Sequence, residues 1–175
     1  NNLNSGHVME RMLVHMPTGT GKTKTSMHII VNYINFSLEK KGVVIWIAHT
    51  TELLQQAYDT FVSVWQHLGD GHINAYKLWG SKNICDSEKP LNGIVFCGLS
   101  KMMSIADSNP TLYERLKKDC RLVVFDEAHK AAAKQTKKVI EELMRMPPGY
   151  ENRALIGLTA TPGRTTEDSY DNNLL

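Results

Sequence analysis

The sequence is poor in cysteine, has no long hydrophobic run and shows no strong excess of either charge. Its three cysteines, Cys85, Cys97 and Cys120, are widely spaced, and no two form the C-x-x-C pair used by zinc and redox sites. The longest apolar run, Val43 to Ala48, is too short to span a bilayer, and no basic, apolar leader stands at the N-terminus. We therefore expect a cytoplasmic, intracellular protein with reduced thiols and no membrane partner.

The overall charge of the chain gives no sign of nucleic-acid binding. Twenty Lys and Arg residues stand against eighteen Asp and Glu, a formal net charge of +2, so a polyanion-binding surface is not signalled. With 175 residues, of which 42% are hydrophobic, the chain can bury the core of one domain. Any prediction of a nucleic-acid partner must come from motifs.

Strand-like and helix-like apolar patterns alternate along the chain. The expected strands are residues 11–15, 43–48, 73–79, 94–97, 122–125 and 154–158. The expected helices run from Lys24 to near Gly42, over 53–68, between Ser100 and Lys118 with a break at Pro110, and around 139–144. Residues 80–93 are polar and predict a surface loop. This alternation predicts an α/β fold, with a mainly parallel sheet covered by helices on both faces.

A glycine-rich segment, PTGTGKT, follows the first expected strand and opens the first expected helix. Its glycines allow successive N–H groups to point at a phosphate chain, and the helix N-terminus adds partial positive charge. Lys22 can reach the β and γ phosphates, and the hydroxyl of Thr23 can bind Mg²⁺. The predicted nucleotide-binding residues are Thr18, Gly19, Thr20, Gly21, Lys22 and Thr23.

One position departs from the phosphate-loop (Walker A) pattern G-x-x-x-x-G-K-[ST]. Met16 stands where that pattern has glycine, and its bulk can change how tightly the loop closes. A G-K-[ST] triplet also arises by chance in about one chain in ten of this length. A degenerate nucleotide-binding module that serves only as an interaction platform therefore stays open as an alternative.

Two acids follow the buried strand 122–125. Asp126 is suited to hold Mg²⁺ together with Thr23, and Glu127 to orient and polarise the water that attacks the γ-phosphate. The plainer interpretation is a helix N-terminus whose dipole favours acids without any metal. A phosphate loop earlier in the chain favours the catalytic interpretation, with Glu127, Lys22 and Asp126 as catalytic residues.

With a phosphate loop and an acidic pair after a buried strand, the sequence resembles superfamily 2 helicases and translocases. PTGTGKT, DEAH and the TAT of LIGLTATPGR look like motifs I, II and III of that family. The resemblance implies the first domain of an ATP-driven nucleic-acid motor, a RecA-like P-loop NTPase domain that uses ATP and Mg²⁺. It also implies that His129, Thr159 and Thr161 couple the nucleotide site to the nucleic-acid path. The run LTATPGR resembles DNA-acting members, such as restriction-enzyme motor subunits, more than RNA helicases.

Two weaker matches concern nucleic-acid contacts. AHTTELLQQ resembles motif Ia, but His49 stands where proline is usual and Thr51 where arginine is usual. A phosphate-binding charge is therefore missing from this segment. The segment after strand 94–97 resembles motif Ib, with Gly98 in place of the usual threonine. The candidate contacts with nucleic acid are His49, Thr50, Gly98 and Ser100.

The resemblance also divides the chain. We expect an N-terminal segment over residues 1–10, the RecA-like domain over 11–164, and a polar tail or linker over 165–175 that leads to a second RecA-like domain. Nothing after Arg164 resembles motifs IV to VI, which carry the arginine fingers, so this monomeric fragment should hydrolyse ATP weakly. A P-loop ATPase that acts without nucleic acid remains the other alternative.

Overall fold

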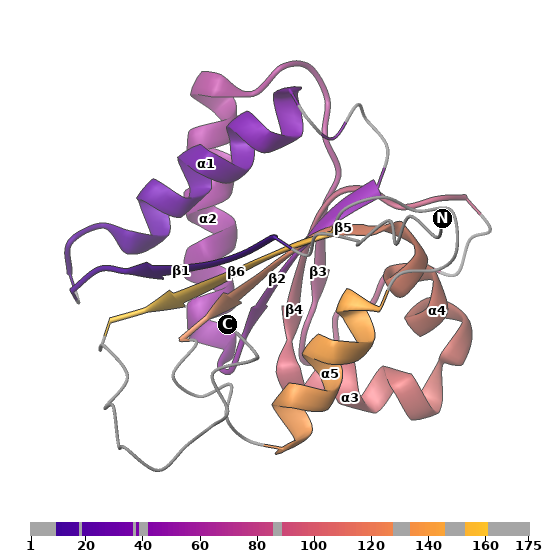
Figure 1. Cartoon of the computed structure of the whole chain (residues 1–175). Coiled ribbons are helices and arrows are strands. Elements are labelled where there is room, and N and C mark those ends of the chain that lie inside the picture. The colour runs from indigo at the N-terminus through magenta and orange to yellow at the C-terminus, as the bar shows by residue number, and fades with distance from the viewer. Residues whose placement is uncertain are drawn as a thin grey trace, which may run out of the picture.

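Parallel strands form one sheet at the centre of the molecule (Figure 1). The computed structural model describes residues 10–17, 19–36, 38, 42–85, 89–127, 134–145 and 153–160. The strands are β1 (Glu10–His15), β2 (Gly42–Ala48), β3 (Ala75–Leu78), β4 (Asn92–Gly98), β5 (Cys120–Asp126) and β6 (Ala154–Thr159). Their order in the six-stranded sheet is β1-β6-β5-β2-β4-β3, and every neighbouring pair is parallel.

Helices cover both faces of the sheet, as Figure 1 shows. They are α1 (Lys22–Phe36), α2 (Thr51–Leu68), α3 (Leu99–Ser108), α4 (Pro110–Asp119) and α5 (Lys134–Met144). The helices α1 and α2 pack on one face, and α3, α4 and α5 pack on the other. The α/β fold with a parallel sheet covered on both faces is therefore confirmed.

The central strand β2 is apolar throughout because both of its faces are buried. Successive side chains of a strand point to opposite faces, so Val44 and Trp46 face α1 and α2 while Val43 and Ile45 face α3 to α5. All four side chains are fully buried, and burial of each such side chain contributes about 1.5–3 kcal/mol. The continuous apolar run in β2 is the pattern of a doubly covered parallel strand.

The predicted break at Pro110 is confirmed, and its local cause is a helix cap. The side chain of Asn109 accepts a hydrogen bond of 3.0 Å from the N–H of Leu112, and Pro110 is the first residue of α4. Proline suits this position because the N–H that it lacks would have no partner inside the helix. Pro110 therefore begins a second helix beside α3.

Two expectations about the connecting segments were wrong in part. The helix α1 ends at Phe36, short of Gly42; the apolar period continues to Leu38 because that side chain is buried in the core beyond the helix end. The segment 80–93 is not wholly a surface loop, because Ile84 and Leu91 are buried. The N–H of Leu91 donates to a carboxylate oxygen of the buried Asp119 at 2.6 Å, which fixes the entry into β4.

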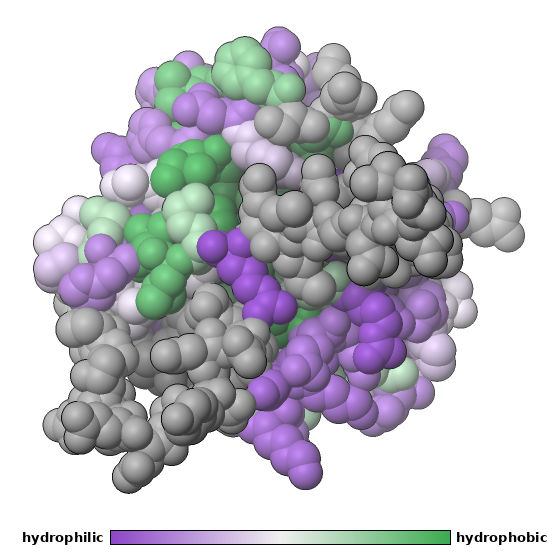
Figure 2. All heavy atoms as spheres, in the orientation of Figure 1, coloured by the Kyte–Doolittle hydropathy of each residue, from purple (hydrophilic) through white to green (hydrophobic). Residues whose placement is uncertain are grey.

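Hydrophobic side chains gather over β1 and the adjoining flank of α1 on the face shown in Figure 2. The edge strand β1 exposes Met12 and Leu13, and α1 exposes Ile29. Among the described residues, no helix is long and apolar enough to cross a membrane. Cys97 and Cys120 are buried thiols, whereas the thiol of Cys85 is exposed.

Candidate nucleotide-binding site

The glycine-rich loop lies between β1 and α1, at the carboxyl edge of the sheet. Gly19 and Gly21 have φ angles of +81° and +84°, a region that other residues rarely adopt. A Cβ atom added at either glycine would meet nothing within 4 Å. The space in front of this backbone is therefore open, as a loop that receives a ligand requires.

Local hydrogen bonds set the curvature of this loop. The backbone N–H and the hydroxyl of Thr20 both donate to the carbonyl oxygen of Pro17, at 3.3 and 2.7 Å. The N–H of Met16 donates to the carbonyl oxygen of Thr159 at 3.1 Å, which ties the start of the loop to the end of β6. Met16 itself is not among the described residues that line the cavity in front of the loop.

Lys22 and Asp126 meet across this cavity. The Nζ atom of Lys22, the first residue of α1, lies 3.6 Å from Oδ1 of Asp126, the last residue of β5. The two side chains are only 14% and 5% exposed. Two opposite charges from distant parts of the sequence are thus brought together at the carboxyl edge of the sheet.

The electrostatics of Asp126 reflect its burial. Loss of solvation raises the pKa of the Asp126 carboxyl above its ordinary value, and the Lys22 ammonium and the N–H of Glu127 oppose this rise. That N–H donates to Oδ1 of Asp126 at 3.0 Å. Burial is the larger effect, so this carboxylate gains from a further cation beside it.

Glu127 adopts a left-handed backbone conformation, with φ of +63°, the only such non-glycine residue in the described part of the chain. For a residue with a side chain this conformation costs about 1–2 kcal/mol. Strain of this kind is concentrated at functional sites. It turns the chain sharply after Asp126, so that both acids line one cavity.

The cavity has a volume of about 360 Å³, within the range of ligand sites. The described residues that line it are Pro17, Gly19, Gly21, Lys22, Thr23, Lys24, Leu53, Gln56, Thr60, Asp126, Glu127 and Ala160. Thr23 and Asp126 offer the hydroxyl and carboxylate oxygens that Mg²⁺ prefers, and Lys22 offers a positive charge for phosphate. These side chains therefore fit a nucleoside triphosphate with its Mg²⁺.

The candidate nucleic-acid contacts lie at the ends of two neighbouring strands, because Ala48 of β2 is the register partner of Gly98 of β4. Thr50 is the N-cap of α2 and accepts a hydrogen bond of 3.3 Å from the N–H of Leu53. His49 packs the edge of its ring against Phe125, with ring centroids 5.6 Å apart.

The segment after β4 presents only one of its candidate side chains to solvent. Gly98 is buried at the N-cap position of α3, and Ser100 is exposed in the first turn of that helix. The structure brings these two segments to one edge, where His49 also contacts the strand that ends in Asp126.

Some predicted positions lie outside the described residues: Thr18, His129 and Thr161, together with the segments 1–9 and 165–175. Thr159 is described and is buried at the end of β6. The roles predicted for these residues and the domain boundaries stay predictions.

One wall of the cavity was not predicted from the sequence. Leu53, Gln56 and Thr60 of α2 line it, together with Lys24 of α1. The spacing of three and four residues places the three α2 side chains on one helical face. That spacing was visible in the sequence, but nothing local shows that this face meets the phosphate loop.

The fold and this site define a RecA-like nucleotide-binding domain of the superfamily 2 type, and the comparisons agree. Residues 2–164 match the family described as type III restriction enzyme, res subunit. The chain belongs to this family, and the resemblance to superfamily 2 helicases is confirmed.

Individual relatives are much longer than this chain. The ATP-dependent DNA helicase mph1 of Neurospora crassa is 30% identical over 165 residues, which are 91% of this chain and 13% of that protein. The helicase domain of Hef from Pyrococcus furiosus superposes with a TM-score of 0.60 at 28% identity, over 91% of this chain and 31% of that chain.

A third comparison bears on the fold alone. The structure of S. cerevisiae dbp5 gives a TM-score of 0.63 at 17% identity, over 89% of this chain and 39% of that chain. At this identity the likeness supports the RecA-like sheet and its helices but no statement about residues.

Proposed function

We propose that this chain binds ATP with Mg²⁺ and is the ATP-hydrolysing half of a nucleic-acid-dependent helicase or translocase. One observation carries the proposal: the Lys22 ammonium lies 3.6 Å from the Asp126 carboxylate in a cavity that the glycine loop also lines. A buried cation and a buried carboxylate at one open cavity suit a phosphate and its metal ion.

Each residue has a distinct role in this proposal. The N–H groups of residues 18–23 and the ammonium of Lys22 hold the phosphates, while Thr23 and Asp126 hold Mg²⁺. The metal ion, when bound, neutralises charge that develops on the phosphoryl oxygens. Glu127 takes a proton from the attacking water and orients it.

The nucleic-acid partner is proposed to be DNA rather than RNA. The family match and the relative whose name is ATP-dependent DNA helicase support this choice, as does the run LTATPGR. His49, Thr50, Gly98 and Ser100 would contact the strand, and His129, Thr159 and Thr161 would transmit its binding to the nucleotide site. The protein would do this work inside the cell.

Full activity is proposed to need a second RecA-like domain. Arginine fingers from a partner domain raise the rate of phosphoryl transfer by about 10³–10⁵, and the relatives extend far beyond the matched part. Alone, this chain would bind ATP as a monomer and hydrolyse it slowly.

Titration of the chain with a fluorescent ATP analogue, with and without Mg²⁺, tests the first part. We expect saturable binding that Mg²⁺ strengthens. Absence of binding would favour an interaction module in which Met16 prevents closure of the loop.

Stimulation of ATP hydrolysis by single- or double-stranded DNA, measured in a protein that includes the second domain, tests the second part. Equal rates with and without DNA and RNA would favour a P-loop ATPase that acts without nucleic acid. Stimulation by RNA alone would reassign the partner.

A further inference from the structure

The helix α2 forms a wall of the nucleotide cavity on the side of the two acids. In the sheet, β2 lies directly beside β5, and α2 begins three residues after β2 ends. The first turns of α2 therefore stand next to Asp126 and Glu127 at the end of β5, whereas the glycine loop approaches from β1. Leu53, Gln56 and Thr60 are the α2 residues that line the cavity.

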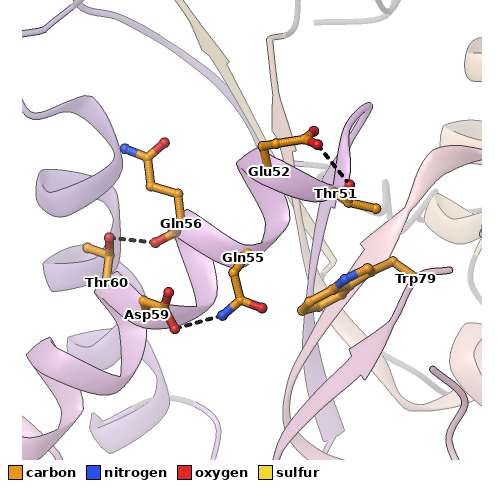
Figure 3. Close-up of a pocket in the computed structure, with 7 residues that line it drawn as sticks. All are labelled: Thr51, Glu52, Gln55, Gln56, Asp59, Thr60 and Trp79. Carbon is orange, nitrogen blue, oxygen red and sulfur yellow. Dashed lines mark hydrogen bonds between the residues drawn. The ribbon is translucent and has the colours of Figure 1, made fainter. Parts of the chain in front are cut away.

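Of these three side chains, Gln56 is the one with polar groups available to a ligand. Leu53 is apolar, and the hydroxyl of Thr60 already donates to the backbone carbonyl of Gln56 at 2.7 Å. Figure 3 shows the Gln56 side chain extending from α2 without a hydrogen bond to the other residues drawn. Gln56 is also the only side-chain amide among the described residues that line the cavity.

The neighbouring glutamine has a different environment. Gln55 donates to Asp59 at 2.8 Å and lies toward Trp79 in a second pocket, which Gln56 and Thr60 also line (Figure 3). Gln55 does not line the nucleotide cavity in the described part of the chain. Both glutamines line the second pocket, but only Gln56 also lines the nucleotide cavity, so Gln55 provides a matched control.

We propose that Gln56 binds the terminal phosphate of ATP through its side-chain amide, and so distinguishes ATP from ADP. This inference rests on the proposed function. In the proposed function Glu127 orients the water that attacks the γ-phosphate, so the terminal phosphate would be the part of the nucleotide nearest to that side of the cavity. The α and β phosphates would lie over the glycine loop.

A neutral amide suits this position chemically. A lysine here would pair with the nearby carboxylates, and a glutamate would repel the phosphate. An amide N–H can donate to a phosphoryl oxygen while its carbonyl accepts from water. In some GTPases a glutamine beside the γ-phosphate orients the attacking water, so a side-chain amide is compatible with this place in an NTPase site. A hydrogen bond to a charged group contributes a free energy that corresponds to about 10- to 100-fold in affinity.

The test compares affinities of Gln56→Ala, Gln56→Glu and Gln55→Ala for a non-hydrolysable ATP analogue and for ADP, each with Mg²⁺. We expect Gln56→Ala to weaken binding of the ATP analogue about tenfold and to change ADP affinity little. Gln56→Glu should weaken the ATP analogue further, because it adds a negative charge. Gln55→Ala should bind both ligands as the unmodified chain does.

Thermal unfolding of each variant shows whether it folds; Gln56 is exposed, so little change is expected. Equal losses for both ligands, or no loss for either, would overturn the assignment of Gln56 while leaving nucleotide binding intact. If the unmodified chain bound neither ligand, the proposed function would fail and this inference with it.

Discussion

The ammonium nitrogen of Lys22 lies 3.6 Å from a carboxylate oxygen of Asp126, although one residue begins α1 and the other ends β5. The pair stands at the carboxyl edge of a parallel sheet, where strand ends from distant parts of a chain converge. Both side chains are largely buried, and for Asp126 the loss of solvation outweighs the attraction to Lys22 when no ligand is present. When a nucleotide binds, a phosphate would contact Lys22 and a metal ion would contact Asp126 in place of this ion pair.

Replacement of Lys22 by alanine should weaken binding of ATP with Mg²⁺ by about 100-fold, because a buried charge–phosphate interaction is lost. Nucleotide titration measures this effect. The exposed Lys138 of α5 offers a matched substitution, Lys138→Ala, which should leave affinity unchanged. An unaltered dissociation constant for Lys22→Ala would remove this lysine from the site.

Glu127→Gln should keep ATP binding and abolish most turnover, since the amide retains the shape of the side chain but accepts no proton. In a protein that includes the second domain, phosphate release should fall by about 10²–10⁴-fold. Glu52→Gln, on the exposed start of α2, serves as the control. Turnover that survives in Glu127→Gln would assign the proton acceptor to another group.

Asp126→Asn should raise the melting temperature of the chain at neutral pH in the absence of Mg²⁺. Burial raises the pKa of this carboxyl in the folded state, so the folded protein binds more protons than the unfolded one between the two pKa values. Stability therefore falls as pH rises through that window. The asparagine variant lacks this pH dependence of stability. Its higher melting temperature should therefore disappear below about pH 4, where the aspartate is protonated in the unfolded chain as well.

Thermal unfolding from acid to neutral pH checks this expectation. A lower melting temperature for Asp126→Asn at neutral pH would mean that attraction to Lys22 outweighs the loss of solvation. Nucleotide binding should weaken in the same variant, because a metal ligand is removed.

Gly21→Ala should lower nucleotide affinity with little change in global stability. At φ of +84° an alanine is strained by about 1–2 kcal/mol, although its Cβ would touch nothing within 4 Å. The loop is expected to relax to another shape and to lose its inward N–H groups. Gly71→Ala provides a control with φ of +76° and equally open space away from the cavity; equal affinities of the two variants would contradict this role of Gly21.

Arg153→Met should destabilise the chain by about 3 kcal/mol. Arg153 is only 1% exposed and donates to the backbone carbonyls of Leu143, Arg145 and Lys117, which joins the ends of α5 and α4. Loss of the guanidinium leaves these acceptors without their donor. Denaturant unfolding measures the change, and Arg145→Met, at an exposed position, should have an effect below about 0.5 kcal/mol.

Much of the fold could be predicted because its signals are local. The apolar run of β2, the helical period of α2 and the helix break at Pro110 each depend on residues within a few positions of one another. The burial of Ile84 and Leu91 was not predicted, because it depends on elements that pack over these residues from elsewhere in the chain. Leu38 was predicted to lie in the first helix, but it is buried beyond the end of that helix.

The candidate site divides in the same way. PTGTGKT and the acids at 126 and 127 were found from residue types and their place at the ends of predicted strands. Gln56 was not found, since its role follows from the position of β2 beside β5 rather than from its own neighbours. The burial of Arg153 was not predicted for a similar reason, because the residues next to a single arginine before a strand do not indicate that its side chain is buried.

The amino-acid sequence by itself determined the alternation of strands and helices and the residue types offered to a phosphate and a metal ion, because hydrophobic period and backbone freedom are properties of short segments. The tertiary structure decided which of those segments meet. The order of strands in the sheet brings the ends of β1, β6, β5 and β2 to one cavity, and that order is fixed by the packing of both sheet faces, to which residues from the whole chain contribute.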